Sequence, residues 1–110
     1  MGISKTAYFT KRQNELAVIM KALGHPARIA IIDYLLSVDA CICGDIVNVL
    51  PLAQPTVSQH LKALKNAELI QGNIEGNAIC YCINEETFAQ FKNSLDEVFG
   101  KIQIRKNNCC

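Results

Sequence analysis

Long apolar runs are absent from this sequence, since none approaches the roughly 20 residues that cross a membrane as a helix. The N-terminus also lacks the apolar core of a secretory signal. Histidine is scarce, with His25 and His60 the only two, and no nucleophilic side chain has an evident base partner. These absences predict a soluble, cytoplasmic protein with no membrane partner, no catalytic cofactor and no enzymatic activity.

Net charge is also small, at +1, so it gives no general argument for a nucleic-acid partner. The charges are nevertheless segregated. Residues 1–28 carry five cations against one acid, whereas residues 75–99 carry five acids against one cation. The basic N-terminal region is therefore the part suited to phosphate.

Six cysteines are present in 110 residues, and 50% of the residues are hydrophobic. A chain of this length suits a single domain over residues 1–110 and is too short for two. Secreted scaffolds usually spread cysteines between loops, but these occur as three close pairs, Cys41/Cys43, Cys80/Cys82 and Cys109/Cys110. Close pairs in a reducing cytosol indicate metal ligands or redox groups.

Apolar spacing and helix caps predict a mainly α domain with one small β-hairpin. His25 and Asn84 are the expected N-caps of the second and last helices. A flexible tail is expected from about residue 104. The expected helices cover Thr6–Leu23, Pro26–Leu36, Asp45–Leu50, Pro55–Asn66 and a segment from Glu85 to the tail, and the expected strands cover Leu69–Ile74 and Ala78–Ile83.

Two further expectations concern side chains. In the second strand, the large Ile79, Tyr81 and Ile83 should face the core, which leaves Cys80 and Cys82 outward. The last helix carries a long apolar stripe with three phenylalanines, more than a small core covers from one side. We therefore expect a homodimer through the first and last helices.

The order of elements is that of a winged helix-turn-helix, and the residues resemble the ArsR/SmtB family of bacterial metal-responsive repressors. The resemblance is carried by Ala22-Leu-Gly-His-Pro-Ala-Arg28, Cys41-Ile-Cys43 and Gln54-Pro-Thr-Val-Ser-Gln-His-Leu-Lys-Ala-Leu64. A Cys-x-Cys at this place resembles the arsenic-responsive branch. That resemblance implies a homodimeric repressor that leaves its double-stranded operator DNA when As(III) or Sb(III) binds the thiolates.

The helix Pro55–Asn66 is the expected recognition helix, with early residues at base edges and flanking cations on phosphate. Glutamine pairs bidentately with adenine, and the threonine methyl contacts thymine. His60 is as well explained by a hydrogen bond inside the motif as by a base contact. The DNA-binding candidates are Gln54, Thr56, Ser58, Gln59, His60 and Lys62.

The metal-site candidates begin with Cys41 and Cys43. If these two are helical, their side chains point about 200° apart and cannot share an ion without local unwinding. Two sulfurs also leave a three-sulfur arsenite site incomplete, and Ile46 stands where relatives often have another cysteine. Cys109 or Cys110 is the first choice for the missing thiol, from the same chain or from the partner of a dimer.

Three other interpretations remain open. The effector can instead be Cd, Pb or Zn, or oxidation of the thiols. Cys80 and Cys82 can form a separate thiol site or be exposed positions of the wing. The absence of Lys and Arg between Lys65 and Lys92 also suits a winged helix that binds protein rather than DNA.

Overall fold

The structure is a computed structural model that describes residues 7–38, 42–43, 46, 50–75 and 78–105. It is mostly helical with an antiparallel hairpin, which confirms the winged helix-turn-helix prediction. The elements are α2 (Lys11–Leu23), α3 (Pro26–Leu36), β1 (Ile42–Cys43), α4 (Gln54–Asn66), β2 (Ile70–Glu75), β3 (Ala78–Ile83) and α5 (Glu85–Arg105).

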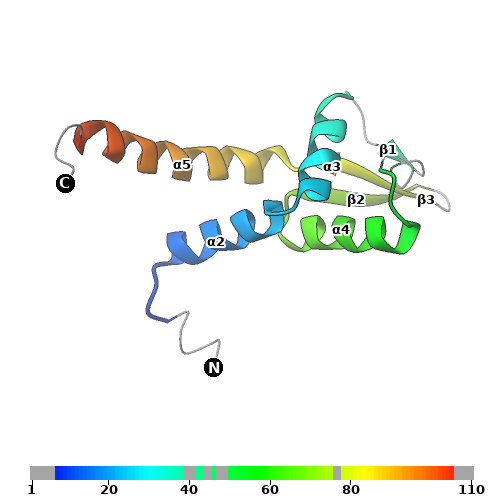
Figure 1. The fold of residues 1–110 in the computed structure, drawn as a ribbon, viewed down its shortest axis with the longest axis horizontal. Helices are drawn as coiled ribbons and strands as arrows, with labels where there is room; N and C mark the ends of the chain where they lie inside the picture. Colours follow the sequence, from blue (N-terminus) through cyan, green and yellow to red (C-terminus); the bar gives the residue numbers. More distant parts are fainter. Residues whose placement is uncertain (1–6, 39–41, 44–45, 47–49, 76–77, 106–110) are drawn as a thin grey trace.

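The three strands form one antiparallel sheet in the order β1-β3-β2, so β3 is the central strand. Helix α4 runs along the hairpin, and α3 lies between α4 and the start of α5 (Figure 1). Helices α2 and α5 contact each other and extend away from the sheet on the same side of α3 (Figure 1). No helix in the described part of the chain is both long enough and apolar enough to cross a membrane.

Local capping residues set the helix starts. Thr10 forms a capping box with Gln13, in which the Thr10 hydroxyl accepts from the Gln13 amide and the Gln13 side chain accepts from the Thr10 amide, both at 3.0 Å. Residues 7–10 are not helical, so the prediction of a helix from Thr6 was wrong. The capping box holds Thr10 in an extended conformation, and the first helical residue is Lys11. His25 and Asn84 accept amide hydrogen bonds as the predicted caps.

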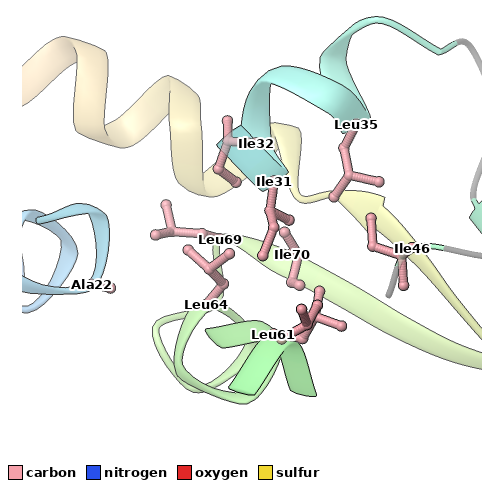
Figure 2. Packing of buried hydrophobic residues seen from close by; sticks show 10 residues of the cluster. Ala22, Ile31, Ile32, Leu35, Ile46, Leu61, Leu64, Leu69 and Ile70 are labelled. Carbon is pink, nitrogen blue, oxygen red and sulfur yellow. The ribbon is translucent and has the colours of Figure 1, made fainter. Parts of the chain in front are cut away.

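The core lies where α3, α4 and β2 meet. Ile31 of α3 and Leu64 of α4 have no exposed surface, and Leu69 and Ile70 follow α4 into the hairpin (Figure 2). The predicted inward face of α4 is confirmed, because Val57, Leu61 and Leu64 are all buried. This packing orients α4 as a rigid element whose opposite face is free for contacts.

The sheet differs from the prediction at two points. Tyr81 and Ile83 pack against the core as expected. Ile79 is 47% exposed and Cys80 only 1%, so the expectations of an inward Ile79 and an exposed Cys80 were wrong. Ile42 and Cys43 form a strand that was not predicted, so the helical conformation considered for this motif does not apply to Cys43. The reason is a non-local pairing with β3. Most of the predicted helix Asp45–Leu50 lies outside the described residues.

Candidate DNA-binding surface and thiol site

The outer face of α4 carries most of the predicted DNA-binding residues. Leu61 and its neighbours on the inner face are buried, whereas the side chains of Gln54, Thr56, Ser58, Gln59 and Lys62 are all exposed. Ala53, at the N-cap, offers no side-chain acceptor, and the amides of Thr56 and Val57 donate instead to the Ala53 carbonyl at 3.0 and 3.1 Å. The dipole of α4 favours anions such as phosphate at this end of the helix.

His60 lies on the other side of α4, in the interior. It is 9% exposed, and its Nδ1 accepts a hydrogen bond of 3.1 Å from Arg28 Nε. Arg28 also donates from Nη1 to the carbonyl of Ala22 at 3.2 Å, and the His25 ring centroid lies 4.4 Å from that of His60. Of the two explanations for His60, the structure therefore favours a hydrogen bond within the motif.

This network joins the end of α2, the start of α3 and the middle of α4. It fixes how the exposed face of α4 is presented relative to the first two helices. The sequence did not single out Arg28 for this role. A signal was present, because Arg28 and His60 both belong to the motifs that carry the family resemblance.

Burial is the main cause that lowers the pKa of His60 from its ordinary 6.5, and the charges of His25 and Arg28 lower the pKa further. A neutral ring can accept from Arg28, whereas a ring protonated on both nitrogens cannot. The stability that His60 contributes is therefore fully present above the unfolded pKa. It decreases as pH falls below about 6.5, because the unfolded chain binds the proton first.

We accordingly expect the free energy of unfolding to decrease between about pH 7.5 and pH 5.5. Urea unfolding at several pH values measures the effect. In His60→Asn, the amide oxygen keeps an acceptor for Arg28 but does not titrate, so the pH dependence should be shallower. If the free energy of unfolding depends equally steeply on pH in this variant, groups other than His60 cause the pH dependence.

Lys65 supplies a cation beside the wing. The wing strands contain no Lys or Arg of their own. Lys65 reaches over β2 from α4, so that its Nζ would lie 3.4 Å from a Cβ at Gly72. This position offsets part of the cation deficit of the hairpin.

The predicted thiol residues are only partly visible. Cys43 stands opposite Cys80 in the β1–β3 pairing, and Cys80 and Cys82 are both disulfide-bonded. Cys41, Cys109 and Cys110 lie outside the described residues. Among the described side chains, which do not include that of Cys43, no group of three or more His, Cys, Asp or Glu is placed to hold a metal ion.

Helices α2 and α5 leave large apolar side chains uncovered. The most exposed of these are Val18 at 55% and Met20 at 46% on α2, and Phe99 at 59% and Ile102 at 58% on α5. Because α2 and α5 contact each other, these side chains extend over adjoining helices.

The comparisons with known proteins agree with this geometry. Residues 25–71 match the family model described as bacterial regulatory protein, arsR family. The arsenical resistance operon repressor of Staphylococcus xylosus is 35% identical over 82 residues, which cover 74% of this chain and 78% of that protein.

Solved structures show the same fold. An ArsR-like transcriptional regulator from Rhodococcus sp. RHA1 has a TM-score of 0.74 at 22% identity, over 87% of this chain and 90% of that one. A homodimeric winged helix-turn-helix DNA-binding domain from Mycobacterium bovis has a TM-score of 0.63 at 23% identity, over 93% and 96% of the two chains. The chain belongs to the ArsR family of bacterial regulatory proteins and is a DNA-binding transcriptional repressor, not an enzyme.

Proposed function

We propose that this repressor responds to a trivalent metalloid, As(III) or Sb(III), which binds its cysteine thiolates and releases it from operator DNA. The observation that carries the proposal is the placement of Ile42 and Cys43, the described residues of the Cys41-Ile42-Cys43 motif. Its described part, Ile42 and Cys43, forms the strand on the N-terminal side of α4. Soft thiolates select soft thiophilic ions. A relative 35% identical is an arsenical resistance operon repressor.

We propose that the exposed face of α4 enters the major groove of the operator. There the side chains of Gln54, Thr56, Ser58 and Gln59 contact the base edges. Lys62 and Lys65 contribute charge contacts to the DNA phosphates. Because these contacts release counterions, the DNA affinity should fall as the salt concentration rises. A purified protein whose DNA affinity did not change with salt would contradict the repressor mechanism. Binding titrations at several salt concentrations provide this test.

Replacement of Gln59 by alanine should cost roughly 1–3 kcal/mol of DNA affinity, mainly at one base pair. The reason is loss of a bidentate contact to a base edge. Titrations against single-base variants of the operator measure the effect. Gln90→Ala on the exposed surface of α5 is the matched control and should bind like the wild type. An equal loss of affinity for all operator variants would show that Gln59 contacts the DNA backbone rather than a base.

The repressor is proposed to act as a homodimer through α2 and α5. The exposed apolar side chains of these two helices support this arrangement, since a second copy would cover them. The Mycobacterium bovis domain of the same fold is homodimeric. A dimer would also present two α4 helices to successive major grooves, as helix-turn-helix repressors do.

Release is proposed to follow from differential binding, in which the metalloid favours a conformation that fits DNA poorly. Extended backbone at Ile42 and Cys43 changes the expected route to this state. Because Ile42 and Cys43 are extended, no helix has to unwind at these two residues before thiols can converge. The coupling free energy required is about 1–3 kcal/mol, or roughly 5- to 150-fold in affinity.

Thiol oxidation is the second candidate input, and a specific observation favours it: Cys80 and Cys82 are disulfide-bonded. DNA displacement measured with arsenite, antimonite, Cd, Pb, Zn and peroxide separates the inputs. If only peroxide releases the DNA, the effector is an oxidant rather than a metalloid. Release by Cd or Pb but not arsenite would make the effector a divalent ion.

A further inference from the structure

Strand β3, with Cys80 and Cys82, is paired with the strand that carries Cys43. We propose that Cys80 and Cys82 complete the thiol site that begins at Cys43, so that the ligands of a soft trivalent ion come from β1 and β3 rather than from the C-terminal tail. This inference rests on the proposed function for the identity of the ion. The association of the two strands' thiols can be tested without any ion.

The backbone register supports the association. Cys43 is paired with Cys80, and Ile42 with Tyr81. Residues directly opposite in an antiparallel pair lie on the same side of the sheet, with Cα atoms about 4.5–5.5 Å apart. Cys82 follows Cys80 by two residues and therefore shares its side of β3. One side of the β1–β3 pair thus carries three cysteines.

Cys80 is buried although its neighbours on the same side of β2 are polar. Cys80 is 1% exposed, yet it does not belong to the connected core cluster that includes Ile31 and Leu64. On its side of the sheet, its partners across β2 are polar and exposed, with Asn73 opposite Cys80 and Gln71 opposite Cys82. Strand β1, which carries Cys43, borders Cys80 on its other side.

The disulfide bonds of Cys80 and Cys82 give the strongest support. A bond between these two residues would join Cα atoms roughly 6.6–6.8 Å apart, the span of two residues of extended strand. That distance is at the upper limit of the roughly 4.4–6.8 Å seen in disulfides. A bond from Cys80 to the residue opposite, Cys43, lies well inside the range. The register thus favours cross-strand bonding.

The proposed site has two states, an oxidised state with a disulfide and a reduced state that binds arsenite. On oxidation, the thiols of Cys43 and Cys80 lose two protons and two electrons to hydrogen peroxide, which becomes two waters, and one S–S bond forms. The disulfide of Cys82 then requires a further cysteine and a second equivalent of hydrogen peroxide, which also becomes two waters. On reduction, the thiols of Cys43, Cys80 and Cys82 displace three hydroxides from arsenous acid. Three S–As bonds form and three waters leave, which gives three soft sulfur ligands.

Disulfide mapping tests the strand association directly. Trypsin separates the cysteine pairs, because cleavage after Arg28, Lys62, Lys65, Lys92 and Lys106 leaves them on peptides 29–62, 66–92 and 107–110. Peroxide-oxidised wild type, digested without reduction, should give peptide 29–62 linked to peptide 66–92. A link between 66–92 and 107–110, or an internal disulfide within 66–92, would overturn the proposal.

X-ray absorption of the reduced protein loaded with arsenite tests the ligands. About three sulfur neighbours are expected in the wild type and about two in Cys80→Ser. The control, with both Cys109 and Cys110 changed to serine, should keep three. Cys82→Ser, at a half-buried position, is the second variant if Cys80→Ser does not fold. Three sulfurs in the β3 variants and fewer in the tail variant would overturn the assignment.

The two experiments distinguish failure of the metalloid function from failure of the assignment of ligands to β3. If wild-type protein binds no arsenite while the 29–62/66–92 link is found, the metalloid function fails and the strand association stands. If arsenite binds but that link is missing and the tail variant loses sulfur, the function stands and the assignment to β3 fails.

Discussion

Replacement of Phe99 by glutamate should convert the proposed dimer to a monomer and weaken operator binding by roughly 100- to 10,000-fold, the usual gain from linking two binding modules. Phe99 is 59% exposed on α5, and Met20 and Val18 on the adjacent α2 are exposed too. A buried, unpaired carboxylate in a dimer interface carries a large desolvation cost. Sedimentation velocity and DNA titration together measure the effect.

Leu36→Glu is the control for this prediction. Leu36 is 62% exposed at the end of α3, so glutamate there adds the same charge to an equally exposed position away from α2 and α5. It should remain dimeric and bind DNA like the wild type. A Phe99→Glu protein that stayed dimeric would place the interface elsewhere.

Arsenite should stabilise the reduced protein by about 2.7 kcal/mol when its free concentration is about 100 times its Kd, because a ligand that binds only the folded state shifts the equilibrium by mass action. Cys43→Ser should lose most of this stabilisation, since serine offers no soft thiolate. Urea unfolding with and without arsenite, under a reductant free of thiols, measures both proteins.

The tail variant with Cys109 and Cys110 changed to serine is the matched control, because it also removes thiols. If the ligands lie on β1 and β3, it should be stabilised like the wild type. Equal stabilisation of Cys43→Ser would show that arsenite binds elsewhere and would remove the strand pair from the sensing mechanism.

Local signals predicted much of the fold. Pro55 and the apolar spacing through Leu64 predicted α4 to within one residue at its start, because helix start signals and helical periodicity are encoded in neighbouring residues. His25 was predicted as a cap for the same reason and accepts from the Ala27 amide at 3.0 Å. The hairpin strands also followed from short-range alternation.

Local sequence signals did not predict the contacts between segments that are distant in the sequence. Nothing near Cys43 in the sequence indicates that it pairs with Cys80, since antiparallel register depends on a strand 37 positions away (80 − 43). The outward expectation for Cys80 failed for this reason: alternation gives the face of a strand but not what covers it. The Arg28–His60 hydrogen bond spans 32 positions and is likewise invisible to local spacing.

Fluorescence anisotropy of labelled operator DNA with the reduced wild-type protein tests the central claim most directly. Affinity should fall with rising salt in the absence of effector. Addition of arsenite should weaken binding by roughly 5- to 150-fold, and removal of arsenite by a competing dithiol should restore it. Unchanged DNA affinity in a protein shown to hold arsenite would contradict the claim that thiol occupancy controls DNA release.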